Sequence, residues 1–275
     1  MTSRPKFSTE PPPTKYALVD FPTPEILLVT LNRPKSLNCI NLDGNTELDA
    51  LWSWLDNEPS LRVGVITGNG RAFCAGADLK EWNDQSAAGT RRQIGPSGFA
   101  GLSRRSGKKP IIAAVNGICF GGGMEAAANC DMVVAAHSAT FALPEVKRGV
   151  IPLAGVLPRV VRTVGKQRAM ELALTGRTLT AQEAYQWGVV NQVVEDANVV
   201  EAAVKLAQMV AGNSPDAVIV TREGIKMGWE GVGVDEATRL ISESWYPQLV
   251  KGENIKEGLM AFVEKRKPQW KGSKL

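Results

Sequence analysis

Three consecutive glycines, Gly121–Gly123, stand between a segment with the pattern of a buried strand and an alanine-rich segment with the pattern of a helix. The apolar run Ile111–Val115 predicts the strand, and Glu125 lies in the first turn of the expected helix. Glycines leave that turn without side chains, so its unpaired backbone N–H groups face any approaching ligand, with the positive end of the helix dipole behind them. The junction therefore predicts a site for an oxyanion, with a carboxylate beside it.

Other interpretations of this junction stay open. Glycine runs also occur where two backbones merely pack closely, and a phosphate-binding loop is a further option, although no G-K-[ST] follows and the G-x-G-x-x-G spacing is absent. Glu125 is also compatible with an ordinary acid that the helix dipole favours in a first turn. Its apolar neighbours, Met124 and Cys130 among them, predict burial, and a buried acid is costly unless it is paired or protonated.

A second segment, Arg71–Lys80, also follows an expected strand directly. Its residues from Cys74 to Ala77 are small and give a ligand access to backbone N–H groups, and Asp78 is placed to cap the next helix. Such loops are common connectors, so this segment alone is a weak indication of function.

A third segment, Phe141–Gly149, carries the acid Glu145 directly after a proline that stiffens its backbone. Glu145 lies 20 residues after Glu125. Two carboxylates divide the acid and base duties of a reaction where a fold brings them together. The spacing does not show that they converge, and an ordinary surface acid is the simpler interpretation of Glu145.

The composition narrows the class of protein. The 275 residues, 44% of them hydrophobic, suffice for a substantial core, and no apolar run reaches the roughly 18 residues that cross a bilayer. The net charge of +4 is mild and suits an anionic small molecule as well as a polyanion. Four cysteines without a C-x-x-C pair predict reduced thiols in a reducing, intracellular compartment. The single histidine, His137, argues against a multi-histidine metal site and a Ser-His-Asp triad, so no metal is expected.

The order of the expected elements indicates an α/β core of repeated strand–strand–helix units followed by a helical section. Further strands are expected at 16–20, 26–31, 62–67 and 132–136, the first two joined by a turn at Pro22–Pro24, with a helix opening near Asp43. Residues 83–107 lack periodicity and predict a surface loop or a mobile lid. Beyond Gly165, a capping box at Thr180–Glu183 opens one helix, and others are expected at 199–211, 216–228, 235–250 and 254–265. We therefore expect a disordered lead-in at 1–15, the core at 16–210 and a helical C-terminal region at 211–275.

The chain ends in Ser273, Lys274 and Leu275, a tripeptide that a peroxisomal import receptor reads at a free C-terminus. This address has meaning only in a eukaryotic cell. We therefore expect a peroxisomal protein whose partners include that receptor.

Taken together, these segments resemble the enoyl-CoA hydratase/isomerase family, the crotonase superfamily. The similarity extends over nearly the whole chain after residue 15, and no single motif decides it, but the order and spacing of the motifs are highly specific. The motifs are Leu31–Asn38, Ala72–Lys80, Ala113–Gly117 with Gly121–Glu125, Pro144–Glu145, Val164–Glu171, Leu174–Gly176 and Phe262–Arg266. The resemblance implies a crotonase (ClpP-like) spiral of ββα units with a helical C-terminal trimerisation region, assembled as a trimer or a dimer of trimers.

The resemblance also implies roles for individual residues. The backbone N–H groups of Ala77 and Gly122 would form an oxyanion hole for an acyl-CoA thioester, whose enolate is the family's shared intermediate. Glu125 and Glu145 match the two glutamates that hold a water and act as an acid–base pair, adding hydroxyl at C3 and a proton at C2. No separate cofactor is implied, because the substrate itself carries coenzyme A. The CoA moiety would lie along Lys35, Ala75, Ala77, Asp78, Leu79, Lys80 and Gly122.

Two departures from the family pattern bear on the acyl group. The usual Gly-Gly-Thr-Gln-Arg-Leu is here Gly155–Val160, and residues 83–107 lack the common pattern. The leading expectation is a peroxisomal enoyl-CoA hydratase, and a specialised hydratase or dehydratase of branched acyl-CoA in fungal siderophore metabolism is the alternative. A Δ3-Δ2 enoyl-CoA isomerase normally needs one acid, so the retained pair argues against it. An RNA-binding protein on this fold would draw on the basic run Lys265–Lys267, yet neither nucleic acid nor a membrane is an expected partner.

Overall fold

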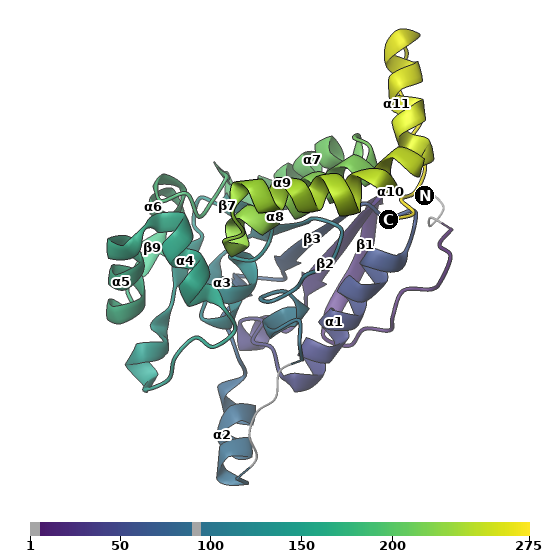
Figure 1. The fold of residues 1–275 in the computed structure, drawn as a ribbon. Helices are drawn as coiled ribbons and strands as arrows, with labels where there is room; N and C mark the ends of the chain where they lie inside the picture. Colours follow the sequence, from purple (N-terminus) through teal and green to yellow (C-terminus); the bar gives the residue numbers. More distant parts are fainter. Residues whose placement is uncertain (1–5, 90–94) are drawn as a thin grey trace.

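Two β-sheets form the frame of the molecule in the computed structural model, which describes residues 6–89 and 95–275 (Figure 1). The larger sheet has the strand order β1-β2-β3-β5-β7-β10, and the smaller one the order β4-β6-β8-β9. Strands β1 and β2 pair antiparallel, as do β8 and β9, and every other pairing is parallel. The strands are β1 (Ala17–Thr23), β2 (Ile26–Leu31), β3 (Val63–Gly68), β4 (Ala72–Cys74), β5 (Ile111–Val115), β6 (Ile118–Phe120), β7 (Met132–Ala136), β8 (Thr140–Ala142), β9 (Thr178–Thr180) and β10 (Gln192–Val194).

Each central strand of the larger sheet continues directly into a strand of the smaller sheet: β3 into β4, β5 into β6, and β7 into β8. A helix or helical turn follows each pair, namely α2 (Leu79–Ala87), α3 (Gly122–Ala127) and η3 (Pro144–Arg148). This repetition confirms the predicted spiral of ββα units. Because β4, β6 and β8 run parallel and adjacent, their carboxyl ends meet at one edge of the smaller sheet.

The helices cover the sheets with the faces that their apolar spacing predicts. Helix α1 (Leu42–Asn57) buries Leu48, Leu51, Trp52 and Leu55, and α7 (Val199–Ala211) packs through a row of alanines across β2, β3, β5 and β7. The capping box at Thr180–Glu183 is present at α6 (Ala181–Gln186). No helix among the described residues is long and apolar enough to cross a membrane. The other helices are α4 (Val156–Val164), α5 (Lys166–Thr175), α8 (Pro215–Glu230), α9 (Val234–Leu240), α10 (Tyr246–Lys251) and α11 (Glu253–Val263), the last projecting from the body in Figure 1.

Two local expectations need correction. Strand β1 runs through Pro22 to Thr23, so the turn lies at Pro24 and Glu25; the proline is tolerated because it lies in an edge strand at a register shift. The expected loop over 83–107 includes the end of α2 and the buried turn η2 (Phe99–Gly101), while residues 90–94 lie outside the described part of the chain. Phe99 is only 2% exposed, so the part of this segment around η2 belongs to the core, whereas the end of α2 is mostly exposed.

The lead-in expected to be disordered contacts the body over its described part. The ring of Phe7 packs against Phe21 and Trp54, with ring centroids 4.6 and 5.1 Å away. The Ser8 N–H donates to the Glu58 carboxylate at 2.8 Å. Residues 1–5 lie outside the described residues, and for the rest the long-range aromatic contacts provide order that the proline-rich composition does not predict.

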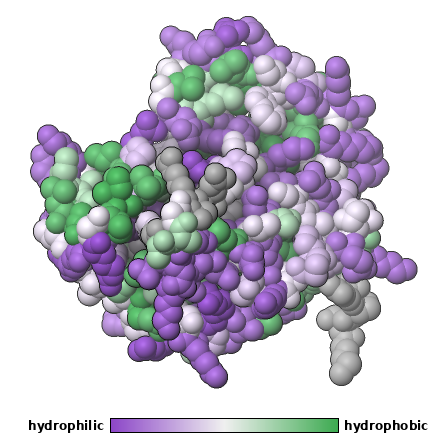
Figure 2. All heavy atoms as spheres, turned by 90° about the horizontal axis from the view of Figure 1, so that it is seen from below, coloured by the Kyte–Doolittle hydropathy of each residue, from purple (hydrophilic) through white to green (hydrophobic). Residues whose placement is uncertain are grey.

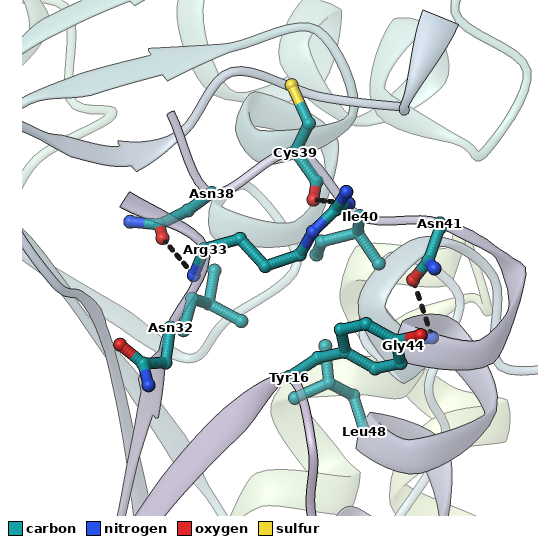
Figure 3. A pocket seen from close by; sticks show the side chains of 10 residues that line it. Tyr16, Asn32, Arg33, Asn38, Cys39, Ile40, Asn41, Gly44 and Leu48 are labelled. Atoms are coloured by element: carbon teal, nitrogen blue, oxygen red, sulfur yellow. Dashed lines mark hydrogen bonds between the residues drawn. The ribbon is translucent and has the colours of Figure 1, made fainter. Parts of the chain in front are cut away.

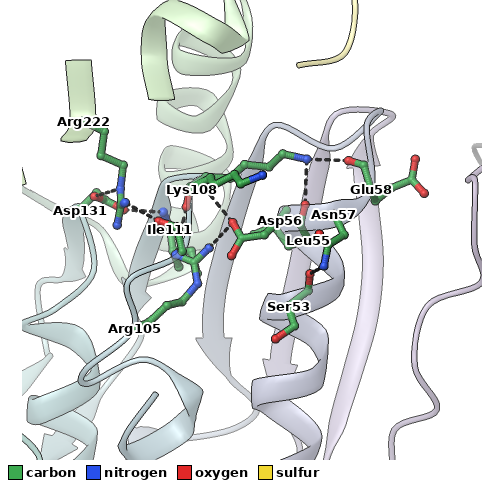
Figure 4. A network of polar contacts seen from close by, with 12 residues as sticks. Ser53, Leu55, Asp56, Asn57, Glu58, Arg105, Lys108, Ile111, Asp131 and Arg222 are labelled. Atoms are coloured by element: carbon green, nitrogen blue, oxygen red, sulfur yellow. Dashed lines mark hydrogen bonds and ion pairs between the residues drawn. The ribbon is translucent and has the colours of Figure 1, made fainter. Parts of the chain in front are cut away.

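A buried polar network connects the loop after η2 to α1 and α8 (Figure 4). The Arg105 guanidinium pairs with Asp56 at 2.6 Å, and the Lys109 ammonium donates to the Leu55 and Glu58 carbonyl oxygens at the end of α1. Burial lowers the pKa of Lys109 to about 8. The network fixes the chain just before β5, and therefore the strand that leads to the glycine junction.

Candidate active site

The loop after β4 is held by backbone pairing with the segment Leu37–Ile40. The Ala75 N–H donates to the Leu37 carbonyl at 3.0 Å, the Ile40 N–H to the Gly76 carbonyl at 3.0 Å, and the Asp78 N–H to the Ile40 carbonyl at 3.1 Å. This parallel bridge uses the groups on either side of Ala77. The Ala77 N–H therefore points away from Ile40, toward the opposite side of the loop.

The glycine junction lies on that opposite side. The Gly121 N–H is taken up by the Ala142 carbonyl at 3.0 Å, and α3 begins at Gly122, whose own N–H has no acceptor in a preceding helical turn. A Cβ placed on Gly76 would lie 3.2 Å from the Gly122 nitrogen, so the two loops are almost in backbone contact. The close packing that the sequence offers as one interpretation of the junction is therefore present, because the loop that carries Gly76 and Ala77 approaches the backbone at Gly122.

Glu125 is buried one turn inside α3, where its side chain is held by two backbone groups. Its Oε1 accepts hydrogen bonds from the Ala154 N–H at 2.8 Å and the Val156 N–H at 3.5 Å. The residue is 5% exposed, and burial, reinforced by the charge of Glu145, raises the pKa of Glu125 to about 7. A carboxyl with this pKa exchanges its proton readily near neutral pH.

Glu145 comes from η3, after β8, and its carboxyl lies against the glycine junction. A Cβ on Gly121 would be 3.2 Å from Glu145 Oε1, and the buried Oε2 has no hydrogen-bond partner within the described residues. Burial raises the pKa of Glu145 as well. Buried oxygens are rarely left without a donor, so Oε2 is a place for a water or a substrate group. The structure thus brings the two glutamates to one site, which their spacing in the sequence does not show.

The remaining predicted binding residues surround the loop after β4. Asp78 caps α2 through the Lys80 N–H at 3.2 Å and forms an ion pair with Arg33 at 2.8 Å. Lys35 lies exposed in the turn η1 (Pro34–Ser36), and Leu79 and Lys80 lie exposed at the start of α2. A small pocket beside this loop is shown in Figure 3, where the Arg33 side chain extends between Tyr16 and the Cys39 backbone.

Sequence reasoning does not identify Arg33 or Ala154 as part of this neighbourhood. Arg33 stands in a motif that the family resemblance includes, whereas Ala154 acts only through its backbone, for which no side-chain signal exists. No group of histidine, cysteine, aspartate and glutamate able to hold a metal occurs among residues 6–89 and 95–275. The site as described places the loop after β4 against the glycine junction and brings two carboxyls of raised pKa to the same junction.

Comparisons with known proteins agree with this arrangement. A sequence model of the family Enoyl-CoA hydratase/isomerase matches residues 23–273. The mevalonyl-coenzyme A hydratase sidH of Aspergillus fumigatus is 55% identical over 269 residues, which cover 98% of this chain and 100% of that protein. The mevalonyl-coenzyme A hydratase of Beauveria bassiana is also 55% identical, over 98% of this chain and 99% of its own length. The crystal structure of an enoyl-CoA hydratase from Mycobacterium tuberculosis superimposes with a TM-score of 0.86 at 36% identity, covering 94% of this chain and 99% of that one. The chain therefore belongs to the enoyl-CoA hydratase/isomerase family, and it is a hydratase.

Proposed function

We propose that this hydratase acts on the CoA thioester of a branched 3-hydroxy acid, with mevalonyl-CoA as the first candidate, and exchanges water across the C2–C3 bond. The observation that carries this proposal is the 55% identity, over the full length, to two proteins named mevalonyl-coenzyme A hydratases. The mevalonyl group carries a methyl and a hydroxyl on C3 and a second hydroxyl at its far end. The reaction removes the C3 hydroxyl as water, or adds it back.

In the proposed reaction each group has its own part. The Ala77 and Gly122 N–H groups donate to the thioester oxygen, which becomes an enolate when the C2 proton leaves. One of the two carboxyls, Glu125 or Glu145, takes that proton. The other carboxyl protonates the C3 hydroxyl as its C–O bond breaks, so the products are water and the 2-enoyl thioester. No electron carrier takes part, because neither direction of the reaction changes the overall oxidation state.

The preference for a branched acyl group is drawn from the segment that departs from the family pattern. Pro152 and Ala154 are buried, and the Ala154 N–H donates to Glu125, whereas Ile151 and Leu153 are 57% and 73% exposed. The turn that binds Glu125 therefore continues directly into exposed apolar side chains, next to Leu157 at the start of α4. A wall of this kind is available to contact the methyl branch while the carboxyls act on C2 and C3.

Purified protein assayed with mevalonyl-CoA, crotonyl-CoA and a longer straight-chain enoyl-CoA tests this proposal. The expected result is the highest kcat/KM with the mevalonyl substrate and loss of most activity in Glu125→Gln and Glu145→Gln. Activity on crotonyl-CoA alone would agree with a hydratase and would refute the proposed mevalonyl substrate. Full activity in both glutamine variants would overturn the assignment of the carboxyls.

We also propose that the CoA moiety lies along the loop after β4, with Ala75, Ala77, Asp78 and Leu79 beside it and Lys35 and Lys80 facing its phosphates. The support is positional: Lys35 precedes the segment that pairs with this loop, and Lys80 follows it, so two exposed ammonium groups flank the loop. Lys35→Ala and Lys80→Ala should raise KM without lowering kcat. An unchanged KM in the double variant would contradict the placement.

Self-association is a further part of the proposal, in the form of a homotrimer or a pair of trimers. Helix α11 exposes Leu259, Phe262 and Val263 by 66%, 84% and 79%, and a soluble chain seldom leaves such a row uncovered. A second apolar area belongs to α4, α5 and the loop before them, and it appears at the left of Figure 2. Light scattering of the wild type should give a multiple of the 29.6 kDa chain mass, and Phe262→Ser should reduce it. A monomeric wild type would refute the assembly.

The tripeptide Ser273–Leu275 supports peroxisomal import as the last element of the proposal. In the folded chain the Ser273 hydroxyl donates to Asp216, and the Lys274 ammonium pairs with Glu253 at 2.7 Å. The Lys108 ammonium also donates to the Leu275 carbonyl oxygen at 2.7 Å, and an import receptor has to replace these contacts to read the tripeptide. A fluorescent fusion at the N-terminus should enter peroxisomes, and deletion of Leu275 should leave it in the cytosol.

A further inference from the structure

The turn that binds Glu125 requires an unusual backbone conformation. Ala154 and Val156 direct their N–H groups at Glu125 Oε1, and Gly155 between them has φ +111°, a left-handed value suited to glycine. A turn of this kind holds its shape only if something outside it fixes the central peptide. The identity of that group determines how firmly Glu125 is placed.

Arg159, half-buried one turn further along α4, folds back over this turn. Its Nη1 donates to the Gly155 carbonyl at 3.1 Å and to the Ser103 carbonyl at 2.6 Å. A Cβ on Gly155 would collide with the same Nη1, so the guanidinium occupies the place of the missing side chain. The left-handed φ therefore favours glycine at 155, and a side chain there would displace the end of Arg159.

The second acceptor connects Arg159 to the other half of the site. Ser103 is fully buried, and its hydroxyl accepts from the Phe99 N–H at 2.7 Å. The Phe99 ring packs directly on Gly122, because a Cβ there would be 2.8 Å from three ring carbons. One guanidinium thus joins the turn that binds Glu125 to the segment whose Phe99 ring packs on Gly122.

We propose that Arg159 is a positioning residue for the hydration chemistry, which fixes Glu125 relative to the oxyanion-binding N–H group of Gly122. This inference rests on the proposed roles of those two groups. Arg159 itself does not touch the reacting atoms, because its bonds go to backbone carbonyls on the outer side of the turn. Its removal should leave substrate binding in place and misalign the proton transfer.

The charge of Arg159 gives the proposal a second readout. Two charged groups act on Glu125: Glu145, from η3, raises its pKa, and Arg159, from α4, lowers it. Arg159 is in turn faced by Glu230 at the end of α8 and by two cations, Arg162 and Arg104. Loss of the Arg159 charge should raise the pKa of Glu125. The limb of the pH profile of kcat that follows the titration of Glu125 should then shift to higher pH.

The test compares Arg159→Met and Arg159→Lys with the control Arg162→Met. Arg162 lies exposed on the same helix and, among the described residues, donates its hydrogen bond to the Trp229 carbonyl on α8, so its loss removes a cation without touching the turn. Arg159→Met should lower kcat on the order of 10- to 100-fold with KM little changed, and should shift the pH limb upward. Arg159→Lys retains the positive charge, so the pH dependence of kcat should stay as in the wild type while kcat itself still falls. Arg162→Met should match the wild type in both.

The assay uses whichever acyl-CoA the wild type turns over fastest, so a wrong substrate assignment does not imitate a failure here. Carbon-13 NMR titration of the Glu125 carboxyl, assigned with Glu125→Gln, follows the same pKa shift in the unliganded protein. An Arg159→Met protein with native circular dichroism, wild-type kcat and an unmoved Glu125 titration would overturn the proposal. A lower melting temperature with unchanged kcat would also overturn it, since Arg159 would then serve stability alone.

Discussion

Replacement of Gly76 by alanine tests whether the approach of two loops sets the spacing of the oxyanion donors. Gly76 has φ +102°, and a Cβ there would meet the Gly122 nitrogen and the Phe120 carbonyl oxygen, each at 3.2 Å. Both contacts are tighter than a carbon normally makes, so the loops have to separate by a few tenths of an ångström. Left-handed strain for a residue with a side chain costs about 1–2 kcal/mol. Loss of one oxyanion donor costs about 3–4 kcal/mol of transition-state stabilisation, on the order of 100- to 1,000-fold in kcat.

Gly165→Ala is the matched control for this change. Gly165 also has a positive φ, +80°, at the junction of α4 and α5, and its Cβ would meet no atom within 4 Å among the described residues. Gly165→Ala therefore introduces the backbone strain of a positive φ without pushing a Cβ against a neighbouring loop. Urea unfolding should give similar losses of stability for both variants, whereas only Gly76→Ala should lose kcat for hydration. A folded Gly76→Ala enzyme with wild-type kcat would refute the claim that this contact positions the donors.

Three further predictions concern buried groups. Because the folded pKa of Glu125, about 7, lies above the unfolded value of 4.5, its favourable contribution to stability is present at low pH and is lost as the pH rises through about 7. We therefore compare the unfolding free energy of Glu125→Gln with that of the wild type at about pH 5 and at about pH 8. The difference should move in favour of the variant by about 2 kcal/mol between the two pH values, and the same difference at both would contradict the raised pKa. Lys109→Met removes the donor to the Leu55 and Glu58 carbonyls and should cost about 2 kcal/mol in urea unfolding while kcat stays unchanged; a stability equal to wild type would show that those carbonyls need no donor. The buried thiol of Cys74, whose pKa burial raises to about 12, should resist iodoacetamide in the native enzyme and react after unfolding; rapid native labelling would exclude the packing described around it.

The order of the elements was predictable from sequence because local signals determine it. Apolar runs mark β3, β5 and β7 within a residue or so, and the capping box at Thr180–Glu183 opens α6 as expected. The buried turn η2 was not predictable, because Phe99 and Leu102 are buried by contacts with distant residues and their own segment shows no period. The ordered conformation of residues 7–9 depends in the same way on contacts with Trp54 and Glu58, which lie far away in the sequence.

The convergence of Glu125 and Glu145 depends on sheet register, which spacing along the chain does not specify. Pairing of Cys119 with Phe141 places the end of β6 beside the end of β8, and the two acids follow those ends. The two acids can be recognised as candidates in the sequence, whereas their proximity in space depends on the pairing of two parallel strands. The family resemblance implies that meeting, and the geometry of η3 against Gly121 shows how the backbone produces it.

The site therefore has two parts. The sheets fix the position of one part, and the turn at 154–156 fixes the position of the other. Under the proposed function the oxyanion donors are the backbone N–H groups of Ala77 and Gly122, which strand pairing and the close packing of glycines would hold in place. Glu125 is placed differently, by a turn at 154–156 that adjoins the exposed Ile151 and Leu153. Changes in that segment would then alter the proposed acyl pocket while the sheets keep the proposed enolate site in place. Arg159 is then the group that allows such variation, because it ties the variable turn back to the segment covering Gly122.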